Sequence, residues 1–528
     1  MDALQEQVFA FLGDPATHGV AQVRRCDTHA AAVFLAGDIA FKVKRAVRFP
    51  FLDYSTPAKR RAACLAELEV NRRFAPQLYR RVVAITRAPG GRLAIGGDGE
   101  TVEWAVEMAR FDENDTLDRI AARGALDACL PARLATSVVA MHAAAERVDA
   151  APWIAALDEY VEQNAVAFRG QAALFATPRV AELARRSRAA LRRLRPLLAA
   201  RGRRGLVRRG HGDLHLGNIV LIDGAPVAFD AIEFDPVVAS GDVLYDLAFL
   251  LMDLAERGLA DAANAVLNGY FAALRCDEDY DGLAALPFFM SLRAAIRAKV
   301  TASRLADAAA AEKPAIAAAA ARYFALALDL LAPAPAVVVC TGGLSGTGKT
   351  ALARALAPCL RPRPGALVLR SDVMRKAMFG VGETERLPPP AYASGVSAQI
   401  YGALADKAGR IARAGASVIV DAVFARADER AAIESVARGA GVVFWGLFLT
   451  ADLETRLRRI GGRGADASDA DAAVARQQED YAVGAMTWNV VDASGTAAAT
   501  LALARACLEE KGLLVEGHPP RGAAGCGG

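Results

Sequence analysis

One short segment, residues 337–350, limits the fold of this chain more than any other. It begins with the apolar run Val-Val-Val-Cys, which is typical of a short buried strand. A glycine-rich loop follows, in which Gly343 and Gly348 stand five residues apart and Lys349 and Thr350 come directly after. A strand, a loop with this spacing and a helix make up the P-loop pattern. Because the flanking strand is present, the segment predicts a site for nucleotide phosphates.

Strand and helix patterns alternate through the rest of this second half. Apolar runs typical of strands stand at 337–340, 366–369, 417–420 and 442–449, with helical patterns between them. The alternation predicts an α/β domain with a parallel sheet. A stiff Ala-Pro linker precedes the domain. We therefore place the domain at 336–512 and expect the tail, 513–528, to be disordered.

The loop itself supplies the candidate nucleotide-binding residues of this half. Glycines let backbone N–H groups point at phosphate oxygens, and the helix that begins near Lys349 adds its positive dipole end. Lys349 would neutralise phosphate charge and Thr350 would bind Mg²⁺. The candidates are Gly343, Ser345, Gly346, Thr347, Gly348, Lys349 and Thr350.

Two further carboxylates follow strands of the same domain. Asp421 ends the strand at 417–420 and is the second candidate Mg²⁺ ligand, and the next residue, Ala422, is not the glutamate usual in mechanical ATPases. Asp372 follows the strand at 366–369, where it would orient or deprotonate an acceptor hydroxyl. The competing interpretation makes Asp372 the N-cap of a helix at 373–379.

A second group of polar residues lies in the first half, at 211–230. Asp213 and Asn218 stand five residues apart, directly before a strand at 219–222. The turn Asp223-Gly224 and a return strand at 227–229 bring Asp230 back beside Asn218. The segment thus combines oxygen ligands suited to Mg²⁺ with a carboxylate that can accept a hydroxyl proton.

The first 105 residues predict a small strand-rich lobe, and residues 106–331 predict a helical lobe. A hairpin with a two-residue loop, Gly37-Asp38, leads into the strand Ile-Ala-Phe-Lys-Val-Lys at 39–44. Lys42 and Lys44 point to the same face of this strand. A helical pattern at 59–74 carries Glu67 and Glu69. An Ala-rich helix is predicted at about 306–331.

The segment His-Gly-Asp-Leu-His-Leu-Gly-Asn at 211–218 resembles the catalytic loop of the aminoglycoside phosphotransferase and choline kinase group, which has the protein-kinase fold. The resemblance implies that Asp213 is the catalytic base and that Asn218 and Asp230 bind Mg²⁺. It further implies a strand lysine on the phosphates, Lys42 rather than Lys44, held by Glu67 with Glu69 as the alternative. The usual Gly-rich loop is missing before the hairpin, where Thr28 and His29 stand instead.

The second half resembles small P-loop kinases such as polynucleotide kinase, gluconate kinase and the zeta-toxin group. This resemblance implies that Asp372 acts on the acceptor, that Arg375 holds an anionic substrate, and that Arg459 and Arg463 belong to a lid over the phosphates. The whole chain resembles bacterial bifunctional aminoglycoside phosphotransferase/P-loop ATP-binding proteins. ATP and Mg²⁺ are then the implied cofactors, and hydroxylated small molecules, more plausibly metabolites than antibiotics, the implied substrates.

Other function classes remain open or are disfavoured. The P-loop domain is alternatively an ATP-binding or ATP-hydrolysing regulatory module fused to a kinase or pseudokinase. With 63 basic and 59 acidic residues, the net charge of +4 gives no reason to expect a dedicated nucleic-acid partner. Long uninterrupted apolar runs are missing, so we expect no membrane partner. Eight scattered cysteines and a start without a basic segment favour the cytoplasm, and the oligomeric state stays open.

Overall fold

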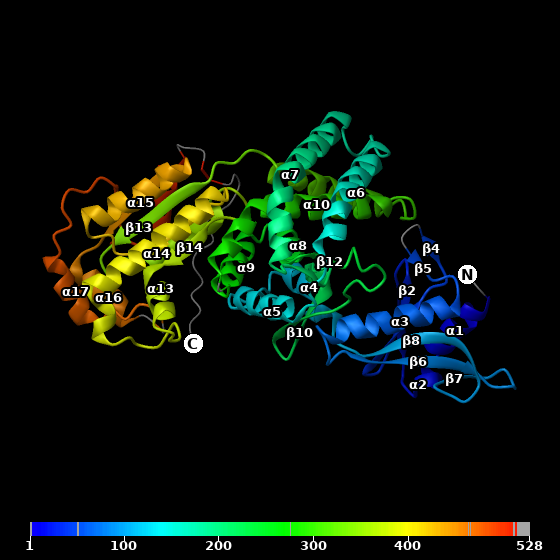
Figure 1. Ribbon diagram of the computed structural model, residues 1–528. Coiled ribbons are helices and arrows are strands. Elements are labelled where there is room, and N and C mark those ends of the chain that lie inside the picture. Colours follow the sequence, from blue (N-terminus) through cyan, green and yellow to red (C-terminus); the bar gives the residue numbers. More distant parts are fainter. Residues whose placement is uncertain are drawn as a thin grey trace. The chain divides into compact units, whose positions relative to one another are not determined.

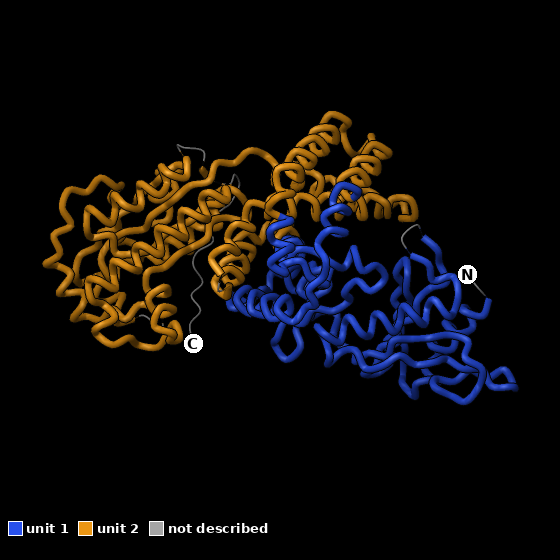
Figure 2. The backbone as a smooth tube through the Cα atoms, viewed as in Figure 1, with its two compact units in different colours: residues 1–159, 198–250 blue, residues 160–197, 251–528 orange. Residues whose placement is uncertain are grey.

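The computed structural model describes residues 3–49, 52–274, 276–462, 464, 466–509 and 513–514. The chain divides into two compact units, coloured separately in Figure 2. The first comprises residues 1–159 and 198–250, and the second comprises residues 160–197 and 251–528. Three helices are divided between the units: α6 (Ala150–Arg169), α7 (Thr177–Arg203) and α8 (Val243–Glu256).

The first unit contains an antiparallel six-stranded sheet in the order β1-β2-β3-β8-β6-β7. Its strands β8, β6 and β7 are labelled in Figure 1. The helix α3 (Pro57–Arg72) packs against β6 and β8 of this sheet. Val8, Phe34, Val43 and Ile85 belong to its buried core, to which helix α1 (Ala3–Gly13) contributes. The strands are β1 (Val23–Asp27), β2 (Ala31–Ala36), β3 (Ile39–Lys44), β6 (Tyr79–Arg87), β7 (Leu93–Ile95) and β8 (Glu100–Ala109).

The hairpin that carries the two lysines forms as its sequence predicts. Ala36 faces Ile39 across β2 and β3, which leaves Gly37 and Asp38 as the loop. Gly37 has φ +57°, a left-handed conformation that glycine adopts without steric cost. The helix predicted at 59–74 is α3, whose N-cap Thr56 accepts the backbone N–H of Lys59.

The remainder of the first unit is built from helices and short two-stranded sheets. β9 (Val207–Arg209) pairs with β12 (Ser240–Asp242), and β10 (Ile219–Ile222) pairs with β11 (Ala225–Ala228). The loop between β9 and β10 carries Asp213 and Asn218. The helices here include α4 (Leu117–Ala122) and α5 (Leu130–Ala144).

A buried ion pair fixes strand β12 to α7. Arg201 Nε lies 2.6 Å from Asp242 Oδ2, and the two side chains are 3% and 0% exposed. We expect Arg201→Met to lower the free energy of unfolding by about 3–5 kcal/mol, because it leaves a buried carboxylate without its charge partner. Arg133, paired with Asp127 at 2.7 Å but 42% exposed, is the control, and Arg133→Met should cost less than about 1 kcal/mol. Denaturant titration measures both, and equal losses would contradict the expectation.

The second unit contains a five-stranded, fully parallel sheet in the order β14-β15-β13-β16-β17. The predicted parallel sheet is confirmed. The central strand, β13, is buried along its whole length. The strands are β13 (Val337–Gly343), β14 (Leu367–Arg370), β15 (Val418–Asp421), β16 (Val443–Thr450) and β17 (Asn489–Asp492).

Helices connect and cover these strands, with α12 packed against α18 and α14 against α15. They are α12 (Lys349–Leu356), α13 (Ser371–Met378), α14 (Ser394–Arg413), α15 (Ala427–Ala440), α16 (Leu453–Gly461), α17 (Ala472–Gln477) and α18 (Ala497–Glu509). Leu513 and Leu514, at the start of the predicted tail, are buried, and Leu514 bridges to Leu360. Residues 515–528 of that tail lie outside the described residues.

Within the same unit, helix α9 (Ala260–Ala272) covers the edge strand β14. Asn264 donates to the carbonyls of Pro364 and Ala366 at 3.1 and 3.0 Å. Asn268 accepts the N–H of Val368 at 2.7 Å and donates to Ala366 O at 3.1 Å. These amides satisfy backbone groups that an edge strand leaves unpaired.

The helices α10 (Leu286–Ser303) and α11 (Lys313–Leu330) pack against each other. The Ala-rich helix that was predicted from about residue 306 is α11, and it begins at Lys313. Pro314 stands in its first turn, where a missing N–H costs nothing, and the residues just before it form turns. In the part of the chain that the structure describes, no helix combines the length and the apolar character needed to cross a membrane.

Candidate active sites

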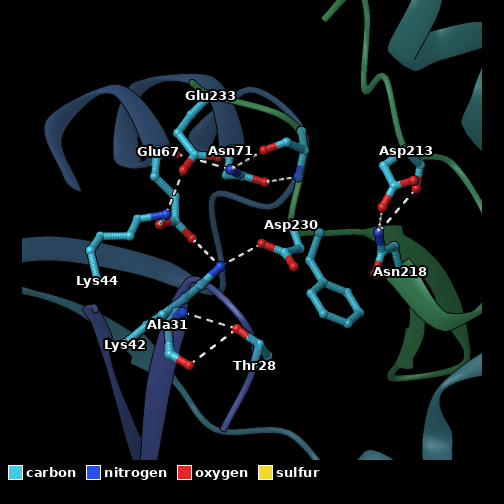
Figure 3. Close-up of polar contacts among 12 residues, drawn as sticks. Thr28, Ala31, Lys42, Lys44, Glu67, Asn71, Asp213, Asn218, Asp230 and Glu233 are labelled. Carbon is cyan, nitrogen blue, oxygen red and sulfur yellow. Dashed lines mark hydrogen bonds and ion pairs between the residues drawn. The ribbon is translucent and has the colours of Figure 1, made fainter. Parts of the chain in front are cut away.

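The first candidate site is built around the loop between β9 and β10 (Figure 3). Asn218 Nδ2 donates to Asp213 Oδ2 and to the Asp213 carbonyl, both at 3.0 Å. The amide nitrogen of Asn218 is thus held by Asp213, which leaves its oxygen for other ligands. At the start of the same loop, the backbone N–H groups of His211 and Gly212 donate to the Asp246 carboxylate at 2.9 and 3.0 Å.

The hairpin of β10 and β11 brings Asp230 to this loop, as predicted. The N–H of Phe229 donates to Asn218 O at 2.9 Å, so the next residue, Asp230, lies near Asn218. The His211 ring lies 2.9 Å from Phe229 O, and burial lowers the pKa of this histidine. Asp230 itself has φ +62°, a conformation that is uncommon for a residue other than glycine.

Both candidate lysines reach Glu67, which is fully buried. Lys42 Nζ lies 2.6 Å from Glu67 Oε1 and 2.5 Å from Asp230 Oδ1. Lys44 Nζ lies 2.7 Å from Glu67 Oε2 and 2.5 Å from Glu233 Oε1. Between the two glutamates, the structure selects Glu67, because Glu69 is 74% exposed and pairs with Arg73. Of the two lysines, Lys42 is the one that contacts Asp230.

A cavity of about 490 Å³ opens beside these groups. Its polar lining includes Lys42, Asp213 and Asp230, and its apolar walls include Val33, Leu35 and Met108. Apolar walls with a few convergent polar groups are typical of small-molecule sites. Thr28 occupies the position before the hairpin at which the resemblance would place a Gly-rich loop. It also lines the cavity and accepts the N–H of Ala31 at 3.0 Å.

The ion pairs of Glu67 give it an unusual pKa. Burial alone would raise the pKa of Glu67, but the Lys42 and Lys44 ammonium groups outweigh burial and lower it to about 2. Between this value and the ordinary pKa of about 4.3, the unfolded chain binds a proton that the folded chain does not. The stability that this carboxylate supplies is therefore present when the pH is above the ordinary pKa. It is lost as the pH falls toward the pKa of Glu67 in the folded chain.

We expect this loss to be measurable as a slope of unfolding free energy against pH. A single carboxyl contributes at most about 1.4 kcal/mol per pH unit, and Glu67→Gln should remove that contribution. Denaturant unfolding at a series of acidic pH values measures the slope. Glu69→Gln, on the same helix but exposed, serves as the control and should keep the wild-type slope. A Glu67→Gln slope equal to that of the wild type would contradict the ion-pair assignment.

The second candidate site is the glycine-rich loop between β13 and α12. Gly343, Gly346 and Gly348 have φ of +132°, +84° and +93°. A Cβ on Gly343 would lie 2.5 Å from the carbonyl of Leu449, and one on Gly346 would lie 2.7 Å from the carbonyl of Arg456. Glycine is therefore required both by backbone conformation and by space.

At the end of this loop, the predicted metal-binding pair comes together. Thr350 Oγ1 donates to Asp421 Oδ2 at 2.6 Å, and Lys349 Nζ donates to Leu344 O at 3.0 Å. The described residues contain no cluster of three or more His, Cys, Asp or Glu arranged for a metal. Each site instead offers two oxygen-bearing side chains, Asn218 with Asp230 and Thr350 with Asp421. Such a pair fits Mg²⁺, which keeps waters and takes phosphate oxygens besides one or two carboxylates.

Asp372 lies in the first turn of α13, close to these groups. The helix begins at Ser371 and its N-cap is Arg370, so the N-cap interpretation of Asp372 is wrong. Burial raises the pKa of Asp372, the charge of Asp421 raises it further, and Lys349 and Arg370 oppose the shift. A half-buried carboxylate near the loop lysine fits the role of a proton acceptor.

The predicted arginines lie in different surroundings. Arg459 donates to the carbonyls of Ala493 and Gly495, both at 2.7 Å, and Arg463 lies outside the described residues. Arg375 is buried and donates to Ala391 O at 2.6 Å, with its guanidinium over the Tyr392 ring. Its two terminal nitrogens bond to Ala391 and Ser397, so Arg375 supports the fold of this region rather than lying open to an anionic substrate.

Several further residues support the two sites, and of these only Arg456 stands in a sequence pattern, beside Arg459 in the stretch that resembles a kinase lid. Asn71 accepts the N–H of Ala231 at 2.8 Å, and the Tyr79 hydroxyl accepts that of Asp230 at 3.1 Å. In the second site, Gln478 accepts the N–H of Ser345 at 2.7 Å, and Arg456 donates to Ser345 O at 2.8 Å. Asn71 is one helical turn beyond Glu67, which is the only pattern that marks it.

Comparison with known proteins follows the same division. Residues 43–286 match the phosphotransferase enzyme family, and residues 338–483 match an AAA domain. The uncharacterized protein Rv2004c of Mycobacterium tuberculosis is 30% identical over 485 residues, which cover 87% of this chain and 90% of that protein. The uncharacterized protein Mb2027c of Mycobacterium bovis matches with the same identity and coverage.

Solved structures resemble each part separately. A choline/ethanolamine kinase family protein from Mesorhizobium loti is 14% identical, with a TM-score of 0.34, over 62% of this chain and 95% of that chain. A gluconokinase from Sinorhizobium meliloti is 18% identical, with a TM-score of 0.25, over 34% of this chain and 93% of that chain. The family matches are to kinase-type domains, which support phosphotransferase activity. The chain belongs to the bacterial family, shared with these mycobacterial proteins, that joins a phosphotransferase domain of the aminoglycoside-kinase type to a P-loop domain.

Proposed function

We propose that the chain is a bifunctional kinase, in which each half transfers the γ-phosphoryl group of ATP to a hydroxyl of a small molecule. The observation that carries the proposal is that each half gathers a lysine, a metal-suited oxygen pair and a separate carboxylate. In the first half these are Lys42, the pair Asn218 and Asp230, and Asp213. In the second half they are Lys349, the pair Thr350 and Asp421, and Asp372.

The residues of each site have distinct roles in this proposal. Lys42, held by Glu67, and Lys349 neutralise phosphate charge, and Asp213 and Asp372 accept the hydroxyl proton of the acceptor. Bound Mg²⁺ would stabilise charge on the phosphate oxygens. Most of the catalysis would come from positioning and charge neutralisation, since phosphoryl transfer needs little covalent participation by the protein.

The alternative is that the P-loop half binds or hydrolyses ATP only as a regulatory module. The contacts of Gln478 and Arg456 with Ser345 favour some coupling of the loop to helix α16 and to the turn that follows α17, because they hold the backbone N–H and the carbonyl of one loop residue. A half-buried carboxylate in the position of Asp372 favours a kinase, since a nucleotide switch has no acceptor to deprotonate. We therefore prefer the bifunctional kinase with hydroxylated metabolites as acceptors.

Nucleotide stoichiometry tests the two-site proposal. We expect two molecules of a non-transferable ATP analogue to bind per chain in the presence of Mg²⁺, because each half has its own lysine and metal ligands. Lys349→Ala should leave only the first site and Lys42→Ala only the second, as measured by equilibrium dialysis or calorimetry. A single bound nucleotide in the wild type, lost in both variants, would overturn the proposal.

A further inference from the structure

The segment that carries Asp230 is held by a second ion pair that the proposed chemistry does not use. Lys42 and Lys44 each take one oxygen of Glu67 and then reach a second carboxylate. Lys42 reaches Asp230, and Lys44 reaches Glu233, three residues further along the same segment (Figure 3). The five charges form a continuous chain, Asp230 to Lys42 to Glu67 to Lys44 to Glu233.

The two ends of this chain differ in exposure. The Asp230 side chain is 45% exposed and lines the cavity, so it is open to a ligand. Lys44 and Glu233 are 4% and 7% exposed, and the Tyr54 hydroxyl donates to Glu233 at 2.8 Å. Lys44 is less exposed than Lys42 (4% against 13%), and both of its carboxylate partners, Glu67 and Glu233, are buried, so its charge is directed to the protein rather than to phosphate. Glu233 is therefore an anchor for its segment.

Asp230 needs such an anchor because its backbone is strained. Its φ of +62° is uncommon for a residue with a Cβ, and surrounding contacts must hold it there. The N–H of Asp230 donates to Tyr79, and the N–H of Ala231 donates to Asn71. The N–H of Ile232 donates to His211 O at 3.0 Å. Glu233 completes this series, so every residue from 230 to 233 is fixed by a neighbour.

We infer that Glu233, held by Lys44 and Tyr54, is a positioning residue that sets the Asp230 carboxylate for the divalent cation of the first site. The inference rests on the proposed function, in which Asp230 is a ligand of that cation. Residues that orient a ligand from outside the coordination shell typically change metal affinity or activity by about 10–100-fold when substituted.

Binding of Mn²⁺ together with a non-transferable ATP analogue tests this inference by electron paramagnetic resonance. All chains carry Lys349→Ala, so that only the first site binds nucleotide. We expect Glu233→Gln to weaken Mn²⁺ binding about 10–100-fold, with a smaller change in affinity for the metal-free nucleotide. Tyr54→Phe, which removes one hydrogen bond to Glu233, should weaken Mn²⁺ binding less. It carries the test if Glu233→Gln does not fold.

Two comparison variants separate the possible failures. Asp230→Ala should lose Mn²⁺ binding, and Glu69→Gln, which is exposed on the same helix as Glu67, should keep it. Wild-type Mn²⁺ affinity in both folded Glu233→Gln and Tyr54→Phe, with loss in Asp230→Ala, would overturn the inference and leave the proposed function standing. Unchanged affinity in Asp230→Ala would overturn the metal assignment and the inference with it.

Discussion

Asp213→Asn is expected to lower phosphoryl transfer by the first half about 10²–10⁴-fold, the usual contribution of a positioned general base. The substitution keeps the size of the side chain and an oxygen that can accept the amide of Asn218. It removes the negative charge that takes up the acceptor proton. Nucleotide affinity should change little, because Lys42, Asn218 and Asp230 remain.

Single-turnover transfer from labelled ATP, in chains that also carry Lys349→Ala, measures this effect on the first site alone. Asp223→Asn is the matched control, since this exposed residue occupies the turn of the neighbouring hairpin and has φ +50°, which asparagine tolerates. The control should retain wild-type transfer. Transfer that survives in Asp213→Asn at the rate of the control would remove Asp213 from the chemistry.

Lys349→Ala and Asp372→Asn are expected to damage the second site in different ways. Lys349→Ala should weaken nucleotide binding and lower transfer about 10²–10³-fold, because it removes the ammonium group that stabilises negative charge developing on the phosphates. Asp372→Asn should lower transfer while binding is retained, since the carboxylate acts on the acceptor. Nucleotide titration in a Lys42→Ala background and transfer in an Asp213→Asn background report on the second site and distinguish the two effects.

The same pair of variants decides between a kinase and a regulatory module. Asp406→Asn, an exposed change on α14, controls for general effects of losing a carboxylate. Retained binding with lost transfer in Asp372→Asn supports a kinase. If Asp372→Asn hydrolyses ATP like the wild type and no acceptor is ever labelled, the P-loop half is a nucleotide-dependent module.

Local motifs were predictable because the geometry is contained in a few consecutive residues. The spacing from Gly343 to Thr350 dictates a loop with positive φ values. In the first site, the hairpin that follows Asn218 brings Asp230 back beside Asn218. The structure agrees with the preference for Glu67 over Glu69, but the helical pattern alone could not decide between them, because the choice depends on which face of α3 packs on the sheet. Both glutamates fit the same helical pattern.

Contacts between distant segments account for most of what the sequence did not predict. Glu233 meets Lys44 across 189 residues, and Gln478 meets Ser345 across 133. Neither Glu233 nor Gln478 stands in a sequence pattern that indicates its partner. Arg375 follows a plausible substrate loop, yet packing against Tyr392 buries it. The chain is so rich in arginine that residue type alone could not separate structural arginines from those available to a ligand.

Labelling of metabolites offers the most direct test that this chain carries two phosphotransferase sites. Wild type, Asp213→Ala, Lys349→Ala and the double variant would each be incubated with γ-labelled ATP, Mg²⁺ and a small-molecule extract of the source cells. Labelled metabolites, labelled protein and free phosphate are then separated. We expect one set of labelled metabolites to disappear in each single variant and all of them in the double variant. Free phosphate as the sole labelled product, dependent on Lys349 alone, would contradict two kinase sites and leave an ATPase beside an inactive kinase fold.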